Sequence, residues 1–285
     1  MKNKKSVFLV LFSVALLTLQ GCDPIMFIPD LFAELFNPNL IIIRGEKPIS
    51  GEGKTYTIPK GTTVRFKDTV FGSYGPQGSL IFSGGAKLIA QGTLEDPIVF
   101  ESMDGTGIVT FETSASTSSI IEYCSLEDVG VVCKNTITIQ YCKFNSNHGA
   151  NVGIACNNNS NPIIQYNNFF FTNIYIDGDI SNMPAPTIQY NNIDLDLWLN
   201  HSGTGIGICL YYGSSNTIIK FNNIINTYGY AIASSYYSSA TINISSNYVS
   251  DCHGETGVDT DGSQCAGVVI DSFSTSPISG AGCGW

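Results

Sequence analysis

The sequence predicts an all-β fold, a parallel β-helix in which short strands wind into stacked coils. Three observations predict it: a hexapeptide recurs along the chain, its copies lie at coil-length intervals, and the composition favours strands and turns. Charged residues make up only 13% of the 285 residues, which include 29 glycines and 14 tyrosines. One elongated domain of stacked coils accommodates a chain of this length.

Six copies of the hexapeptide each begin with isoleucine and end with an apolar residue. They start at residues 121, 139, 164, 188, 219 and 244, so consecutive copies lie 18 to 31 residues apart. This is the length of one β-helical coil, and the longer gaps indicate loops that leave a coil. A β-sandwich has no reason to repeat one hexapeptide, and a propeller blade needs a longer period. We therefore expect the six isoleucines to stack in one buried column.

The fourth position of the hexapeptide indicates a structural ladder along the stack. Asparagine tolerates the left-handed backbone that a sharp bend requires, and amides stacked about 4.8 Å apart can hydrogen-bond to one another. Cysteine is small and often buried, so it fits the same interior position. The ladder residues are Cys124, Cys142, Asn167, Asn191, Asn222 and Asn247. A second sheet of the same coils is predicted by the apolar residues Val131, Ile154, Ile208 and Ile232.

The first coils resemble a known group of proteins. Three segments carry the likeness: Tyr56-Thr-Ile-Pro-Lys-Gly-Thr-Thr-Val-Arg-Phe66, Gly78-Ser-Leu-Ile-Phe82, and residues 85–102. From residue 54 onward the chain resembles the right-handed parallel β-helix repeat proteins of the pectate-lyase-like superfamily, in their exported bacterial branch. The resemblance implies a right-handed β-helix over residues 54–285. It implies no particular activity, because a shared fold does not carry a shared function.

The amino terminus has the features of a lipoprotein signal peptide. Three lysines among the first five residues precede an apolar run that is shorter than a comfortable membrane span. Leu19-Gln-Gly-Cys22 then resembles the lipobox of bacterial lipoproteins, in which the cysteine is acylated and becomes the mature N-terminus. An uncleaved membrane helix is the alternative. We expect removal of residues 1–21 and lipid attachment at Cys22, on the outer or the inner membrane of the bacterial cell envelope.

Residues 22–53 are expected to form a tether followed by a cap. Asp30-Leu-Phe-Ala-Glu-Leu-Phe36 has the apolar spacing of a short helix and lies between Pro29 and Pro38. Such a helical cap would cover the open end of the stack, whose edge could otherwise pair with another chain. Residues 272–285, rich in glycine and serine, are expected to be either the opposite cap or a loose tail.

The charge of the chain bears on its partners. The chain has 13 basic and 23 acidic residues, a net charge of -10, and removal of residues 1–21 takes away three lysines and no acids. An acidic chain does not favour nucleic acid or anionic lipid. We expect membrane attachment through the lipid, with a polysaccharide or an envelope protein as the further partner. No cofactor is expected, although calcium is compatible with this charge.

The catalytic pattern of pectate lyases is incomplete in this chain. These enzymes hold calcium with aspartates on neighbouring coils and use an arginine as the base. Arg44 and Arg65 both precede the hexapeptide coils, so the base has no counterpart there. Lys134, Lys143 or Lys220 could act instead if its pKa were depressed, although each is also an ordinary solvated lysine.

The motifs of polygalacturonases, another enzyme group with this fold, are absent. These motifs have the forms Asn-Thr-Asp, Asp-Asp, Gly-His-Gly and Arg-Ile-Lys. His148 and His253 each precede a glycine and so match only part of one motif, which a turn residue also explains. The sequence therefore identifies no catalytic residues for an enzyme.

Three pairs of aspartates are the acidic candidates: Asp177 and Asp179, Asp194 and Asp196, and Asp259 and Asp261. Paired carboxylates can bind calcium or supply an acid and a base. Counted from their hexapeptides, the first pair lies 13 and 15 residues on and the second 6 and 8, so stacking is not expected. Asp259-Thr-Asp-Gly262 resembles a fragment of a calcium loop, which makes Asp259 and Asp261 weak calcium candidates beside the simpler reading of solvated turns.

Eight cysteines follow Cys22, in a compartment that permits disulfides. Cys252 and Cys265 flank an acidic loop and are the candidate disulfide pair, whereas the cysteines of the coils are expected to be buried side chains.

Aromatic rings between the hexapeptides could stack against sugar rings, although tyrosine is also common in strands. These possible ligand-binding residues are Trp198, Tyr211, Tyr212, Tyr228, Tyr230, Tyr236 and Tyr237.

Two classes of function remain. The first is a non-catalytic lipoprotein whose rigid β-helix presents loops to a polysaccharide or a protein. The second is a polysaccharide-active enzyme, a lyase, hydrolase or epimerase. Two ionisable groups converging in one cleft would favour the enzyme.

Overall fold

The computed structural model describes residues 37–67, 78–102, 105–146, 153–157, 159–178, 181–195, 205–210, 216–227, 231–234, 242–251, 258–260, 268–270 and 274–284. The signal peptide, Cys22 and the helix expected over residues 30–36 lie outside these ranges. The chain divides into two units, residues 1–42 and residues 43–285, and the second holds the coils. Among the residues described, no helix is long and apolar enough to cross a membrane.

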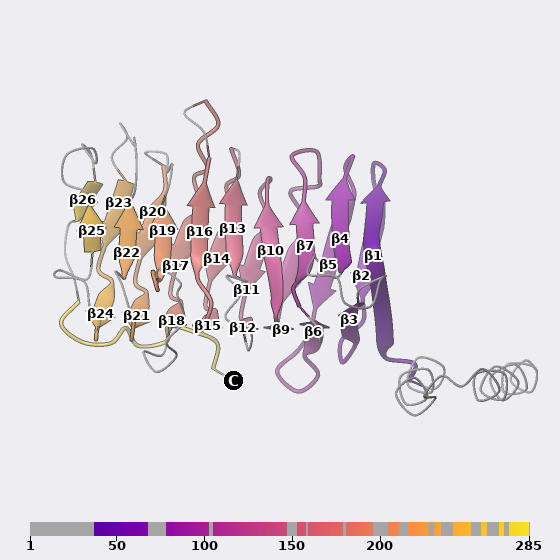
Figure 1. Ribbon diagram of the computed structural model, residues 1–285, viewed down its shortest axis with the longest axis horizontal. Helices are drawn as coiled ribbons and strands as arrows, with labels where there is room; N and C mark the ends of the chain where they lie inside the picture. Colours follow the sequence, from indigo (N-terminus) through magenta and orange to yellow (C-terminus); the bar gives the residue numbers. More distant parts are fainter. Residues whose placement is uncertain are drawn as a thin grey trace, which may run out of the picture. The chain divides into compact units, whose positions relative to one another are not determined.

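The coils of the second unit carry parallel strands on three faces, named A, B and C, and each strand pairs with its counterpart on the next coil (Figure 1). Face A holds β3 (Thr63–Lys67), β6 (Ile98–Ser102), β9 (Cys124–Glu127), β12 (Lys143–Asn145), β15 (Asn168–Phe170), β18 (Asn192–Asp194), β21 (Asn223–Ile225) and β24 (Tyr248–Ser250). Face B holds β1 (Leu40–Ser50), β4 (Gly78–Ser83), β7 (Gly107–Phe111), β10 (Val129–Cys133), β13 (Ile154–Asn157), β16 (Ile174–Asp177), β19 (Ile208–Leu210), β22 (Ile232–Ser234) and β25 (Val258–Thr260). Face C holds β2 (Thr55–Ile58), β5 (Lys87–Gln91), β8 (Ile120–Glu122), β11 (Thr138–Gln140), β14 (Ile163–Gln165), β17 (Thr187–Gln189), β20 (Ile218–Lys220), β23 (Ile242–Ser245) and β26 (Val268–Ile270).

This arrangement confirms the prediction of an all-β fold of stacked parallel strands and is compatible with a β-helix. The pairing begins at β1, whose residues 45–50 lie in register with β4, so strand structure starts ahead of residue 54. Faces A and B form one hydrogen-bonded sheet, and face C forms a second.

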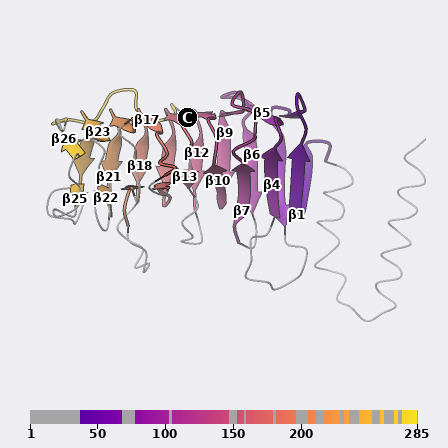
Figure 2. The same ribbon diagram turned by 90° about the horizontal axis from the view of Figure 1, so that it is seen from above.

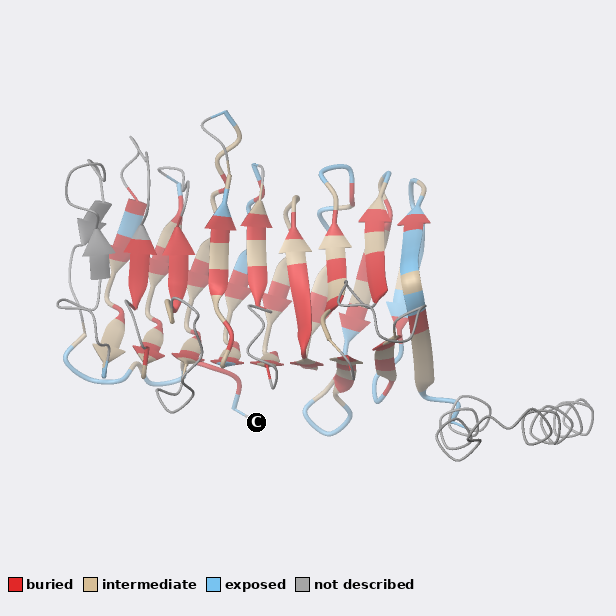
Figure 3. Cartoon of the chain, in the orientation of Figure 1, coloured by how far each residue is buried: buried red, intermediate tan, exposed pale blue. Residues whose placement is uncertain are grey.

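Alternation of side chains explains why these short segments form strands. In β3, Val64 and Phe66 are buried, whereas the residues between and beside them point outward. Buried residues fill the interior along the described coils (Figure 3). Aromatic rings stack there, with 5.2 Å between the ring centroids of Phe82 and Phe111 and 4.7 Å between those of Phe144 and Phe169. One coil could not bury this surface alone, so stability comes from the stack.

The isoleucines of the hexapeptides form one buried column on face C. Parallel pairing places each in register with the next, and all are at most 1% exposed. They are Ile121, Ile139, Ile164, Ile188, Ile219 and Ile244. On face B, Ile174 lies between Ile154 and Ile208 in the corresponding column, a member that the sequence pattern missed.

The bend between faces C and A differs from the sequence-based expectation. The left-handed backbone is adopted by the third residue of the hexapeptide and not by the asparagine that follows it. The residues with this conformation have φ between 48° and 56°, and they are Tyr123, Tyr141, Tyr166, Tyr190, Phe221 and Ser246. The asparagine is instead held inside the bend by its side chain.

The amides inside this bend form a hydrogen-bonded ladder. Asn167 donates from Nδ2 to Oδ1 of Asn191 over 3.0 Å, and Asn191 and Asn222 each donate likewise to the next asparagine over 2.9 Å. Each amide oxygen also accepts from the backbone N–H of the preceding ladder residue, beginning with Cys142. All six ladder positions, cysteines included, are fully buried. The amides therefore satisfy polar groups that burial would otherwise leave without partners.

Residues 274–284 form a segment, here called the strap, that runs back along the outside of the coils (Figures 1 and 2). Outward asparagines at the fifth hexapeptide position bind it: Asn223 accepts from the N–H of Ile278 over 2.7 Å, and Asn192 donates to the carbonyl of Ala281 over 3.0 Å. Asn168 donates to the carbonyl of Cys283 over 3.1 Å. The strap is thus neither of the two expected forms, an end cap or a loose tail.

Candidate functional site

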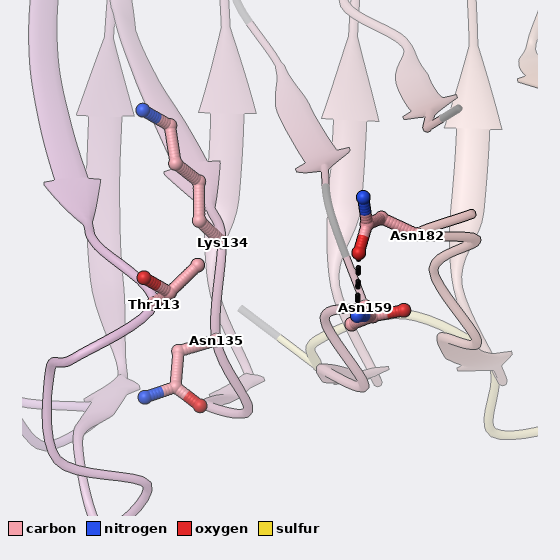
Figure 4. Close-up of a pocket in the computed structure, with 5 residues that line it drawn as sticks. All are labelled: Thr113, Lys134, Asn135, Asn159 and Asn182. Carbon is pink, nitrogen blue, oxygen red and sulfur yellow. Dashed lines mark hydrogen bonds between the residues drawn. The ribbon is translucent and has the colours of Figure 1, made fainter. Parts of the chain in front are cut away.

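The turns that lead from face B to face C surround an open pocket of about 410 Å³ (Figure 4). Four consecutive coils contribute to it, because each turn follows directly on a strand of face B. The pocket is lined by Thr113 after β7, Lys134 and Asn135 after β10, Asn159 after β13, and Asn182 after β16. We call it the rim pocket.

Lys134 is held in place by an ion pair with the preceding coil. Its Nζ lies 3.0 Å from Oε1 and 3.3 Å from Oε2 of Glu112, and both side chains are about one-third exposed. The two residues follow in-register strands, β7 and β10, so the stacking of the coils brings them together. The positive charge at the pocket is therefore largely balanced within the protein.

The asparagines of the rim pocket are fixed by local hydrogen bonds. Asn159 donates from Nδ2 to Oδ1 of Asn182 over 2.9 Å, and its backbone N–H donates to the carbonyl of Asn182 over 3.1 Å (Figure 4). Asn135 donates to the carbonyl of Ala115 and accepts from the N–H of Thr136 over 2.7 Å. These contacts orient the amides before any ligand arrives.

The chemistry of the rim pocket suits a polar ligand with many hydroxyl groups. An amide presents two N–H donors and an oxygen with two lone pairs, so it can serve a hydroxyl group in either direction. Three asparagines, one threonine and one lysine line the pocket. Among these lining residues Lys134 alone is ionisable, and acid–base catalysis generally needs two such groups within reach of the substrate.

The lysines and arginines considered from sequence lie on different faces. Lys134 reaches the rim pocket, whereas Lys143 lies in β12 on face A and Lys220 in β20 on face C. Arg44 lies in β1, and Arg65 in β3 bonds through Nε to Oε1 of Glu101 over 2.7 Å. The stack thus does not bring these cations together.

The aspartate pairs are likewise divided. Asp177 ends β16 on face B, whereas Asp194 ends β18 on face A and accepts from Nδ2 of Asn226 over 2.9 Å. Asp259 lies in β25, whose side chains are not described. Asp179, Asp196 and Asp261 lie outside the described residues. Within the ranges that the structure covers, no three metal-ligating side chains come together.

Several further candidates fall outside the described residues. They include the two histidines, the cysteines of the expected disulfide and every aromatic residue proposed as a sugar platform. These residues are His148, His253, Cys252, Cys265, Trp198, Tyr211, Tyr212, Tyr228, Tyr230, Tyr236 and Tyr237. They stay predictions from sequence.

An aromatic column that the sequence argument overlooked lies at the bend between faces C and A. The rings of Tyr123, Tyr141, Tyr166, Tyr190 and Phe221 are stacked, with consecutive centroids 5.0 to 5.1 Å apart. Its signal was available, because the third hexapeptide position is aromatic in five of the six copies. Ring faces inside the column cover one another, so it presents ring edges and is not an open platform for sugar stacking.

Burial raises the pKa of several thiols in the coils. Cys133 and Cys156 lie in register on face B, and burial raises the pKa of both thiols. Burial, with a smaller contribution from Asp177, raises the pKa of Cys209 to about 11. Since the thiolate is the nucleophile, a raised pKa keeps these thiols protonated near neutral pH and disfavours nucleophilic chemistry.

Comparisons with protein-family models, with curated proteins and with solved structures found no match for this chain.

Proposed function

We propose that this chain is a non-catalytic lipoprotein of the bacterial cell envelope that binds a polysaccharide at the rim pocket. Its fold would be a right-handed parallel β-helix of the pectate-lyase-like superfamily. The stacked parallel strands and the motifs over residues 56–102 support that assignment. Export and attachment rest on the lipobox-like Leu19-Gln-Gly-Cys22. The partner at the membrane would be the lipid bilayer, reached through acylated Cys22.

One observation carries the binding proposal: four consecutive turns converge on one pocket lined by oriented amides. A ligand entering this pocket meets donors and acceptors already fixed by Asn159–Asn182 and by Asn135. Pre-organised groups lose little conformational entropy on binding, so most of each new hydrogen bond adds to affinity. Because the negative charge of Glu112 balances the positive charge of Lys134, the pocket favours a neutral or weakly charged glycan over a strongly anionic one.

A specific observation also supports the alternative of a polysaccharide-active enzyme. Glu112 and Lys134 form a carboxylate–ammonium pair beside the pocket, and such a pair could transfer protons. Under this alternative, Glu112→Gln would abolish turnover while leaving glycan binding in place. Under the proposal, the protein shows no turnover of the glycan either with or without the Glu112→Gln substitution.

Glycan-array binding of the mature chain, residues 22–285 with Cys22→Ala to prevent acylation, tests the proposal. We expect binding to a defined glycan, and expect Asn159→Ala and Asn182→Ala each to weaken it about tenfold through lost hydrogen bonds. The matched control is Asn243→Ala, because Asn243 is an exposed asparagine on face C, away from the pocket. Binding that survives both pocket substitutions would refute the site, and capture of an envelope protein alone would replace the glycan with a protein partner.

A further inference from the structure

The outer surface of face C carries a regular array over five coils, from β8 to β20. Each coil contributes three outward residues, two from its strand and one from the bend that follows. Parallel pairing keeps these residues in three straight rows. The first row is Ile120, Thr138, Ile163, Thr187 and Ile218. The second row is Glu122, Gln140, Gln165, Gln189 and Lys220. The third row is the aromatic column of Tyr123, Tyr141, Tyr166, Tyr190 and Phe221.

The second row is a hydrogen-bonded chain of side chains. Gln189 donates to Gln165 over 2.9 Å, Gln165 to Gln140 over 2.9 Å, and Gln140 to the carboxylate of Glu122 over 2.6 Å. Side chains that are already ordered have little rotamer entropy left to lose when another surface packs on them. Glutamine ladders and stacked aromatics are also the side-chain arrays that form close interfaces between β-sheets.

The array reads almost the same from either end. The first row alternates isoleucine and threonine about Ile163, and the second holds three glutamines centred on Gln165. Ile163 is 38% exposed, which makes it one of the few large apolar side chains on the described surface. On the first and last of these five coils the second row carries opposite charges, negative at Glu122 and positive at Lys220. Beyond them the row continues with the uncharged Gln91 on β5 and Ser245 on β23. No other residue of the three rows is charged.

This pattern is self-complementary under one particular two-fold rotation. An axis along β14 reverses the order of the coils but keeps the direction of the strands, so each row meets its own counterpart. Glu122 of each copy then lies opposite Lys220 of the other, and Ile163 meets Ile163. The alternative two-fold axis runs along the stack. It would place Glu122 against Glu122 and Lys220 against Lys220, and repulsion between these like charges disfavours that arrangement.

We propose that the outer surface of face C binds a second copy of this chain, forming an isologous dimer about an axis along β14. The inference is independent of glycan binding, because it concerns a different face and needs no ligand. Five coils span only about 19 Å at the strand spacing of about 4.8 Å, so the interface is small and the association weak.

Charge reversal tests the pairing directly, with sedimentation velocity of the mature Cys22→Ala chain over a concentration series. We expect dimer formation by the unsubstituted chain and about tenfold weaker association for Glu122→Lys and for Lys220→Glu, since each puts two pairs of like charges together. The double variant Glu122→Lys/Lys220→Glu should restore association to within about twofold, because the reversed pairs attract again. A monomeric parent chain, or no recovery in the double variant, would overturn the proposal.

A cross-linking experiment covers the case in which a charge variant fails to fold. Gln165→Cys places a thiol on the two-fold axis, opposite the same thiol of the second copy. Oxidised glutathione should then give a disulfide-linked dimer, two protein thiols being oxidised as one glutathione disulfide is reduced to two glutathione thiols. The control Thr110→Cys, on the outer side of β7 on face B, should stay monomeric. A folded Gln165→Cys chain that gives no more covalent dimer than this control would overturn the proposal.

Discussion

At the scale of single residues, asparagine and tyrosine have separate roles at the bend between faces C and A. Tyrosine takes the left-handed backbone, at a cost of about 1 to 2 kcal/mol per residue that ring stacking offsets by about 0.5 to 1.5 kcal/mol per pair. Asparagine keeps an ordinary backbone and supplies buried donors and acceptors. Asn191, for example, accepts from Asn167, and its Nδ2 lies within hydrogen-bonding distance of Oδ1 of Asn222 and of the carbonyls of Ile164 and Gln189.

Replacing one rung of this ladder should therefore be costly. We expect Asn191→Ala to lower the free energy of unfolding by about 3 kcal/mol, because several buried groups lose their partners at once. The control Gln189→Ala removes one half-exposed side chain from the second row of face C and should cost about 0.5 kcal/mol. Urea unfolding measures both, and equal midpoints for the two variants would contradict the assignment.

The thiol of Cys209 makes stability depend on alkaline pH. Its pKa rises from the ordinary 9.0 to about 11 in the folded protein, chiefly through burial. The folded state thus holds the proton more tightly than the unfolded state does. The contribution of this thiol to the free energy of unfolding is complete below pH 9 and is lost as the pH rises toward about 11. We expect stability to fall across that window and to fall less steeply in Cys209→Ala. Parallel pH profiles of the two proteins in urea unfolding would refute the linkage.

At the scale of elements, the strap closes over the outward asparagines of three coils. Glycine fits position 282 because φ there is 83° and a Cβ would lie 2.2 Å from side-chain amide atoms of Asn168 and Asn192, which would have to shift. Gly284 offers a matched comparison, since a Cβ at that position meets nothing within 4 Å.

We expect Gly282→Ala to destabilise the protein by about 1 to 3 kcal/mol, through backbone strain and displacement of the strap. Gly284→Ala should leave the thermal unfolding temperature nearly unchanged. Hydrogen exchange at Ile278 should also quicken in the first variant, because that N–H is donated to Asn223. Identical behaviour of the two variants would show that the strap is not held as described.

The sequence predicts the coil elements well because stacking forces periodicity on them. Identical neighbours favour the same residue at each hexapeptide position, which is why the isoleucine column and the asparagine positions are visible without a structure. The rim pocket has no such signal, because Asn135, Asn159 and Asn182 belong to connections of unequal length between strands of faces B and C. The strap was equally hidden, since its partners lie as many as 141 residues away in the chain. The sequence-based expectation placed the left-handed backbone at the fourth hexapeptide position, because asparagine tolerates that conformation. The asparagine is there for its buried hydrogen bonds, and the third residue takes the left-handed backbone.

At the scale of the whole molecule, the anchor is the first element of the proposal to test. We expect Cys22→Ala to abolish acylation and to move the protein out of the membrane fraction, because no lipid would then hold it. Mass spectrometry of the amino terminus and fractionation of cells measure the two effects. An unchanged membrane fraction would contradict the lipid anchor, and loss of the protein from all fractions is distinguished by immunoblotting of the whole culture.

The central claim is that the coils recognise a polysaccharide without transforming it. The most direct measurement incubates the mature Cys22→Ala chain with neutral and uronic-acid polysaccharides, with and without calcium, and follows binding, new reducing ends and the absorbance of unsaturated products together. The account predicts saturable binding that is weakened by Asn159→Ala, with no product at any protein concentration. Product that accumulates in proportion to the protein and disappears with Glu112→Gln would contradict it and identify an enzyme.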